Sequence, residues 1–299
     1  MKATHLVALL LTPLLAFAQN EPTPEQIEQS KSAARKLVEE LKPQQGVITL
    51  PGGAAQVTVP ESLRYYGSKD AKTILEKIWG NPPSETEFLG MLLPVDRSPM
   101  DENSWGVIID FEDAGYVKDD DAANLDYDEL LQTMKAEAAE SNKAREQAGY
   151  PKVGLIGWAT APHYDAAAKK IYWAKELKFD ESPDHTLNYF IRVLGRRGIL
   201  NLNVVAGMKQ LAEVEKATPT ILSAVEFTEG NRYADFKPGS DKVATYGLAG
   251  LIAGGVLAKT GVLKGIFAAL LAGKKFVIIG AIALIAGLKK LFGKKEPAA

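Results

Sequence analysis

NYFIRVLGRRGILNLNVV, residues Asn188–Val205, contains two runs with the period-two pattern of β-strands on either side of the tetrapeptide Gly195–Gly198. A short loop rich in glycine between two such runs favours a β-hairpin. Two further runs of the same period come earlier, VGLIGWA from Val153 and KKIYWAKELKF from Lys169. Together the four runs predict a meander of antiparallel strands.

Working outward from the meander, strands and helices follow one another in blocks. We expect a hairpin over 46–59, a helix over 68–79, strands over 88–95 and 105–111, a helix over 127–148 capped by Asp126, and a helix over 208–224 interrupted by Pro219. Strands and helices do not alternate strictly, so a doubly wound parallel sheet is disfavoured. The predicted class is α+β, with an antiparallel sheet sandwiched by helices.

The N-terminus reads as a secretory signal. Lys2 supplies a positive start, Leu6–Leu15 an apolar stretch, and Ala16-Phe17-Ala18 a small-x-small cleavage pattern. We expect residues 1–18 to be removed. The alternative is an uncleaved anchor, for which ten apolar residues are about half the length of a spanning helix.

The amino-acid composition indicates in which cellular compartment the protein works and which class of partner it binds. The chain has no cysteine, so an exported protein of this kind is stabilised without disulfides, which suggests a bacterial envelope. Residues 241–299 hold nine lysines and two acids, a formal charge of +7, and Lys2 adds +1. Because the whole chain has a net charge of −2, residues 19–240 carry −10. Nucleic acid is therefore an unexpected partner, because phosphate binding requires a basic surface.

The C-terminal segment is apolar, rich in Gly and Ala, and bracketed by lysines. Its last run, Phe276–Leu288, has 13 residues and is short for one span, unless the flanking lysines reach the interfaces. A two-helix hairpin, favoured by the spacing of Gly250 and Gly254, a single span, and an interfacial helix all remain open. Each alternative attaches the protein to membrane lipid. The anchoring residues would be Lys274, Lys275, Phe276, Leu288, Lys289 and Lys290.

These boundaries divide the chain into five parts. We expect a signal peptide over 1–18, a helical leader over 19–45, an extracytoplasmic α+β domain over 46–240, membrane-anchoring helices over 241–295, and a tail over 296–299. The expected location is the inner membrane of a bacterium, with the main domain outside the cytoplasm.

Sequence motifs of catalysis or metal binding are missing. The acidic run Asp119-Asp120-Asp121 departs from the EF-hand pattern, since Asn124 stands where glycine is required. We interpret it as a loop with helix-capping acids. Outside the signal there are two histidines, His163 and His185, without an HExxH pattern, and neither G-x-S-x-G nor a phosphate-binding glycine motif follows a strand. We therefore expect no metal and no cofactor.

Two sets of residues remain as site candidates. Arg196 and Arg197 at the hairpin tip can clamp a carboxylate or phosphate or contact anionic lipid headgroups, unless they are solvated turn residues. The second set, Asp165 and Glu176 or His163, would serve an envelope hydrolase or transferase. That hypothesis requires the carboxyl groups to lie within about 6–9 Å of each other in one pocket.

Five stretches, in this order and before a lysine-bracketed tail, give the chain a resemblance to a known family. They are GWATAPHYD, KKIYWAKEL, VLGRRGILNLNVVA, ILSAVEFTEGNRYADF and DKVATYGLAGLIAGG. The chain resembles the uncharacterised bacterial membrane-anchored proteins of domain-of-unknown-function family 2167 over about Gly46–Lys295. The family has no established activity, so the resemblance implies an envelope protein and transfers no catalytic residue. The order of elements is also similar to the PsbP-like α/β/α sandwich, whose members are mostly non-catalytic accessory or binding subunits.

These observations favour binding over catalysis. We expect a membrane-anchored envelope protein whose acidic domain faces the periplasm as a non-catalytic binding or accessory module, with an envelope protein as partner. The alternative is the carboxylate-based hydrolase or transferase. A pore is disfavoured, because the apolar segments carry no polar stripe.

Overall fold

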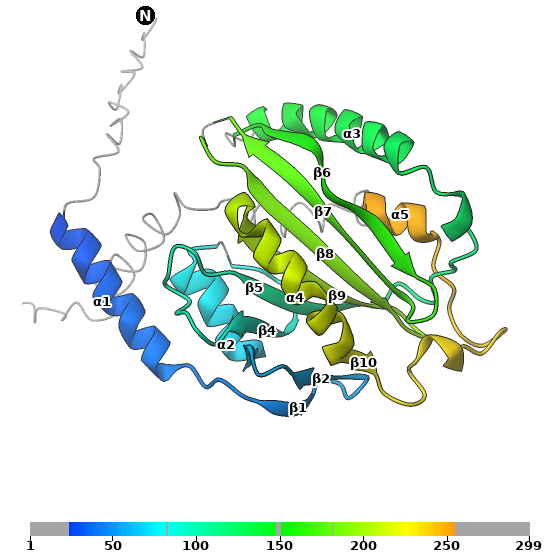
Figure 1. Cartoon of the computed structure of the whole chain (residues 1–299), viewed down its shortest axis with the longest axis horizontal. Helices are drawn as coiled ribbons and strands as arrows, with labels where there is room; N and C mark the ends of the chain where they lie inside the picture. The colour runs from blue at the N-terminus through cyan, green and yellow to red at the C-terminus, as the bar shows by residue number, and fades with distance from the viewer. Residues whose placement is uncertain (1–23, 82, 148–150, 181, 255–299) are drawn as a thin grey trace, which may run out of the picture.

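The computed structural model describes residues 24–81, 83–147, 151–180 and 182–254, and a seven-stranded antiparallel sheet forms its centre (Figure 1). The strand order is β3-β4-β5-β9-β8-β7-β6. The strands are β3 Leu63–Gly67, β4 Phe88–Pro94, β5 Gly106–Glu112, β6 Val153–Asp165, β7 Lys170–Phe179, β8 Thr186–Leu194 and β9 Ile199–Gly207. The meander predicted from the sequence is confirmed as β6–β9, each strand pairing with the next.

A second, three-stranded sheet lies beside the large one, in the order β1-β2-β10. It consists of β1 Gly46–Thr49, β2 Ala55–Val59 and β10 Val225–Phe227. The β1–β2 hairpin confirms the predicted one. Strands β3 and β10 were not expected, because each is short and its own residue pattern does not mark it as a strand. Each is stabilised by pairing with a strand from another part of the chain, β3 with β4 and β10 with β2.

Five α-helices are described. They are α1 Pro24–Glu40, α2 Ser68–Thr73, which continues as the π-helical turn η1 Ile74–Ile78, α3 Tyr127–Gln147, α4 Leu211–Ala224 and α5 Leu248–Ala253. Short 3₁₀ turns lie at η2 Ala122–Asn124, η3 Met208–Gln210 and η4 Tyr233–Asp235. As predicted, Asp126 caps α3: its Oδ1 accepts the backbone N–H groups of Asp128 and Glu129, both at 3.0 Å.

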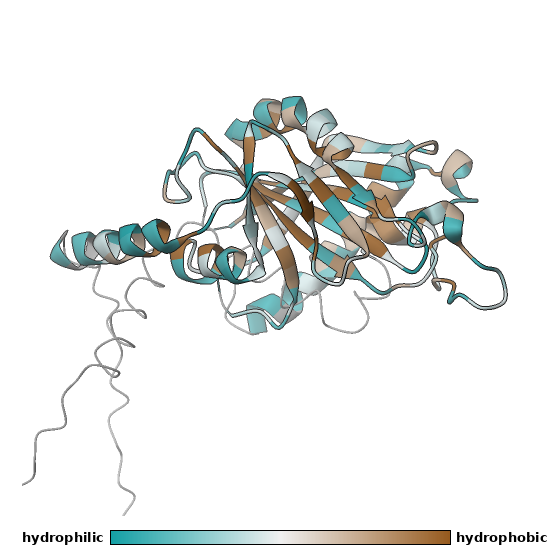
Figure 2. Ribbon diagram, turned by 90° about the horizontal axis from the view of Figure 1, so that it is seen from below, coloured by the Kyte–Doolittle hydropathy of each residue, from teal (hydrophilic) through white to brown (hydrophobic). Residues whose placement is uncertain are grey.

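The two faces of the large sheet bury separate cores. On one face, here the α4 face, α4 and the small sheet cover residues such as Tyr189, Ile191 and Leu202 (Figure 1). On the opposite face, the α5 face, α5 packs on Ile171 and Trp173. Figure 2 shows hydrophobic residues concentrated on the strands, whereas α1 is largely hydrophilic. The predicted α+β class, an antiparallel sheet between helices, is confirmed.

Helix α4 is continuous through Pro219, which corrects the expected interruption. Proline removes one backbone hydrogen bond and costs about 3 kcal/mol in a helix interior. Its neighbours Val214, Thr218 and Ile221 are buried against the sheet. Thr218 Oγ1 also donates to the Val214 carbonyl oxygen at 2.8 Å. Packing on the sheet therefore outweighs the local penalty.

The body continues past the expected boundary at residue 240. In α5, Leu248 and Ile252 are fully buried and Leu251 is 6% exposed. Asp121 caps this helix, accepting from the N–H groups of Leu248 and Ala249 at 3.0 Å each. Gly254 then ends the helix with φ +119°, so Gly250 and Gly254 do not share one long helix.

Within the described ranges no helix has the length and hydropathy needed to cross a membrane. The expected signal peptide and the anchoring residues between Lys274 and Lys290 lie outside those ranges.

The segment before α5 is joined to the β8–β9 turn by an ion pair. Arg196 donates from Nε and Nη2 to the two carboxylate oxygens of Asp241, at 2.7 and 2.8 Å. This bond from Arg196 lowers the pKa of Asp241 to about 2. Gly198 in the same turn lies so close to β5 that a Cβ there would be 2.1 Å from the Glu112 carbonyl oxygen. Both contacts fix the hairpin tip against distant parts of the chain.

Two shortened proteins test the boundary, one ending at Ser240 and one at Gly254. The shorter should have the lower free energy of unfolding, since it loses three buried aliphatic side chains worth about 1.5–3 kcal/mol each. Urea denaturation of both proteins measures the difference. Equal midpoints would show that α5 contributes no stability to the body.

The Arg196–Asp241 pair predicts a loss of stability in acid. The folded-state pKa of Asp241 lies below its ordinary value of 3.8, so the contribution is present above about pH 4 and is lost as the pH falls toward 2. Asp241→Asn should be less stable at neutral pH and lose less between pH 4 and 2. Unfolding free energy measured across this range tests it, with exposed Asp180→Asn as control. Parallel curves for wild type and Asp241→Asn would contradict the assignment.

Candidate functional site

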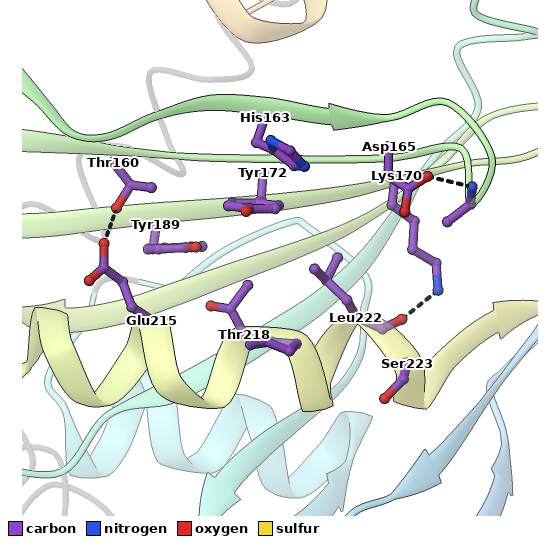
Figure 3. Close-up of a pocket in the computed structure, with 12 residues that line it drawn as sticks. Thr160, His163, Asp165, Lys170, Tyr172, Tyr189, Glu215, Thr218, Leu222 and Ser223 are labelled. Carbon is purple, nitrogen blue, oxygen red and sulfur yellow. Dashed lines mark hydrogen bonds between the residues drawn. The ribbon is translucent and has the colours of Figure 1, made fainter.

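An open cleft of about 560 Å³ lies between α4 and strands β6, β7 and β8, on the α4 face (Figure 3). Ligand sites are usually clefts of about 300–1,000 Å³. The lining residues are Thr160, His163, Asp165, Ala168, Lys170, Tyr172, Tyr189, Glu215, Thr218, Pro219, Leu222 and Ser223.

Three rings from adjacent strands form the aromatic wall of the cleft. His163 on β6 is opposite Tyr172 on β7, with ring centroids 5.1 Å apart and tilted by 40°. The rings of Tyr172 and Tyr189 on β8 are nearly parallel, with centroids 6.2 Å apart. His163 is exposed, Tyr172 half-buried and Tyr189 buried, so the wall runs from the cleft mouth into the core. Burial raises the pKa of Tyr189 to about 12, and its hydroxyl stays protonated at neutral pH.

The charged groups of the cleft have partners within the protein. Asp165 Oδ1 accepts the N–H groups of Ala167 and Ala168 at 2.9 Å each, and these bonds, that of Ala168 first, lower its pKa. Glu215 Oε1 accepts from Thr160 at 2.7 Å. Lys170 donates to the backbone carbonyls of Leu222 and Val225, while burial lowers its pKa. The contacts of Glu215 and Lys170 join the strands to α4 and its end, and those of Asp165 close the β6–β7 turn (Figure 3).

The carboxylate pair of the hydrolase hypothesis, Asp165 with Glu176, does not form. His163 and Asp165 line the cleft, but Glu176 does not. Asp165 is opposite Lys170, and Glu176 lies six residues farther along β7, roughly 20 Å at about 3.3 Å per residue. Glu176 Oε1 is instead 2.5 Å from Nδ1 of His185. Sequence reasoning placed both acids on adjoining strands correctly but had no register with which to measure their separation.

The arginine pair also differs from its expected role. The guanidinium of Arg196 is engaged by Asp241 and donates from Nη1 to the Gly230 carbonyl oxygen at 3.1 Å. Arg197 donates from Nη2 to Asn231 Oδ1 at 2.9 Å. Both side chains therefore hold the segment that follows β10, and the hairpin tip is a structural contact rather than an anion clamp.

The acidic run 119–121 is structural as well. Asp119 accepts from Tyr164 Oη at 2.6 Å, Lys169 Nζ at 2.7 Å and Tyr233 Oη at 3.0 Å. Although burial acts to raise it, these bonds lower the pKa of Asp119 to about 2. Asp121 caps α5, as described above. The interpretation of the run as helix-capping acids holds for Asp121, whereas Asp119 joins three separate segments.

Several cleft residues were absent from the sequence-based candidates. Tyr172 and Tyr189 lie in the predicted strands, and Glu215, Thr218 and Ser223 in the helix predicted over 208–224, without being named as site residues. Period two places Lys170 and Tyr172 on one face of β7, which was the available signal. That α4 faces the same strands follows from the tertiary fold alone.

Solved structures similar to this chain include two neighbours of low identity. The solution structure of cyanobacterial PsbP (CyanoP) from Synechocystis is 11% identical, covering 63% of this chain and 92% of that one, with a TM-score of 0.31. The Ran-binding protein Mog1p of Saccharomyces cerevisiae is 10% identical, covering 66% of this chain and all of that one, with a TM-score of 0.33. No curated protein matches the chain.

Comparison with family models gives one match, and it covers most of the chain. The model is described as "Protein of unknown function (DUF2167)" and matches residues 42–285. This range includes both sheets, helices α2 to α5 and the whole cleft. The chain therefore belongs to the DUF2167 family.

Proposed function

We propose that the protein is a non-catalytic binding module of the bacterial envelope. In this proposal the segment beyond Gly254 attaches it to the inner membrane, the body faces the periplasm, and an envelope protein binds in the cleft between α4 and β6–β8. The apolar, lysine-bracketed sequence after Gly254 supports attachment, and the signal-like residues 1–18 support export.

The observation that carries the proposal is the state of the polar groups in the cleft. General acid–base catalysis requires a group free to exchange a proton with a reacting atom. Here Asp165, Glu215 and Lys170 each accept or donate hydrogen bonds within the chain, and His163 packs its ring against Tyr172 as part of the aromatic wall. What the cleft offers a partner is an aromatic wall with a polar rim, the arrangement that protein interfaces use.

Chemistry of the body supports a protein partner over a nucleic acid. Residues 19–240 have a formal charge of −10, which repels polyphosphate. Tyrosine is enriched in interface hot spots, since it combines a large apolar area with a polar tip. Tyr172, half-buried in the wall, is the residue of this kind that a partner reaches.

Blocking the cleft tests the binding proposal. Ser223 is exposed on α4 and lines the cleft, so Ser223→Trp fills it with an indole while leaving the core intact. Ser141→Trp on the exposed surface of α3 is the matched control. Quantitative co-purification from native membranes should recover the same partner with wild type and control, and at least tenfold less with Ser223→Trp. Equal recovery with all three proteins would rule the cleft out as the binding site.

Cell fractionation tests the attachment. An exported protein ending at Gly254 retains α5 and its core contacts, so its body stays folded. It should be recovered in the soluble periplasmic fraction, whereas the full chain should sediment with the inner membrane. A protein ending at Gly254 that still sediments with membrane would refute attachment through the C-terminal segment.

A further inference from the structure

The α5 face of the large sheet carries a stripe of polar side chains between two apolar clusters. Arg192 on β8 is opposite Asn201 on β9, which is opposite Asp110 on β5. Asn188 on β8 is opposite Lys175 on β7. Phe190 lies between Asn188 and Arg192 on the same face. The side chains of Asp110, Lys175, Asn188 and Asn201 are all 9% exposed or less, so the stripe is buried.

Two cations in this stripe converge on one aromatic ring. Lys175 Nζ lies 5.2 Å from the centroid of Phe190, and Arg192 Cζ lies 5.1 Å from the same centroid. Arg192 Cζ is also 5.3 Å from the ring of Trp173, which stacks on Phe190. Cation–π contacts stabilise the two charges only in part, because each cation keeps N–H groups that need an acceptor.

The nearby carboxylate of Asp110 forms no direct ion pair with these cations within the described residues. Asp110 accepts from Asn201 Nδ2 at 2.7 Å and Asn203 Nδ2 at 3.2 Å. Among the described residues, the contact of Lys175 Nζ is with the Phe190 ring, and Arg192 donates one hydrogen bond, from Nη1 to the Ile191 carbonyl oxygen. A buried cation that forms no ion pair destabilises a folded protein, so an anion bound here would be stabilising.

Neutral donors beside the cations lack acceptors as well. In the described part of the chain, Asn188 Nδ2 and Trp173 Nε1 are fully buried without a hydrogen-bond partner, and so are the acceptors Asn201 Oδ1 and Asn203 Oδ1 at the Asp110 end of the stripe. Asn188 is the cross-strand partner of Lys175, and Trp173 precedes Lys175 by two residues on the same face. Buried polar atoms are satisfied in the great majority of cases, so two orphaned N–H donors beside Lys175 indicate a missing acceptor at this end of the stripe.

We propose that Lys175, Arg192, Asn188 and Trp173 form a binding site for a phosphate group, either that of a lipid headgroup or that of a soluble phosphate. A phosphate has the charge and the several acceptor oxygens that this set of N–H donors requires, and Arg and Lys are the usual side chains that bind it. The site lies on the face opposite the cleft and does not depend on the function proposed for the cleft.

Titration of the site gives its pH dependence. Burial first, and the charge of Arg192 second, lower the pKa of Lys175 to about 7, while Glu137 of α3 acts in the opposite sense. Burial lowers the pKa of Arg192 to about 10, although Asp110, Glu112 and Tyr246 act to raise it. Burial raises the pKa of Asp110 to about 6. Above pH 7 Lys175 becomes neutral and Asp110 is charged, so phosphate binding weakens.

Thermal unfolding of the full chain in detergent micelles tests the site with two probes, inorganic phosphate and dihexanoyl phosphatidic acid, against chloride at equal ionic strength. At pH 6.5 one probe should raise the midpoint, and the rise should be smaller at pH 8.5. Lys175→Met should weaken the binding of that probe at least tenfold. Lys178→Met removes the same charge from an exposed position on β7 and should leave the response unchanged.

The dependence of the two phosphate responses on Lys175 distinguishes the source of the phosphate. A response to inorganic phosphate that depends on Lys175 indicates a soluble phosphate, and a Lys175-dependent response to phosphatidic acid alone indicates a lipid headgroup. No response to either probe, or equal losses in Lys175→Met and Lys178→Met, overturns it. Lys175→Met should itself unfold no earlier than wild type without phosphate, since it removes an unpaired buried charge. Ser223→Trp should keep the phosphate response, which separates this site from the cleft.

Discussion

The β8–β9 hairpin is buried on both faces of the large sheet, and the rest of the fold meets that requirement. Ile191 and Leu202 are covered on the α4 face, and Phe190 and Leu194 on the α5 face. Apolar surface left in water costs about 25 cal/mol per Å². A cover on one face alone would leave half of each strand exposed. Helix α4, the small sheet and α5 therefore come from both ends of the chain to the same hairpin.

The two faces meet this requirement in different ways. The α4 face is closed by apolar packing and leaves its cleft at the edge, beside β6 and β7. The α5 face has a polar stripe at its centre, where Lys175 and Arg192 replace apolar residues. Replacing such groups by apolar ones of similar volume usually stabilises a protein. Local rules of stability are broken most often at functional sites, which supports a binding role for the stripe.

Much of the fold could be predicted from the sequence because its signals are local. The period-two runs of the meander, the cap at Asp126 and the turn after Leu50 each depend on neighbouring residues. Strands β3 and β10 depend on partners distant in sequence, such as Val57 for β10, and were missed. The prediction of an Asp165–Glu176 site was wrong for the same reason. The distance between the two residues is set by strand register, which an alternating pattern does not specify.

The composition of the segment YGLAGLIAGG is compatible both with a membrane helix and with a short helix packed on a sheet. Small and aliphatic residues at helical spacing are typical of membrane helices, but the same pattern fits a short helix pressed on a sheet. What distinguishes them here is outside the segment. Asp121, more than a hundred residues earlier, accepts the first free N–H groups of the helix, and Gly254 ends the helix in a left-handed conformation. Hydropathy measures the environment that a helix tolerates, whereas its ends are set by hydrogen bonds and backbone conformation, which here confine α5 to Leu248–Ala253.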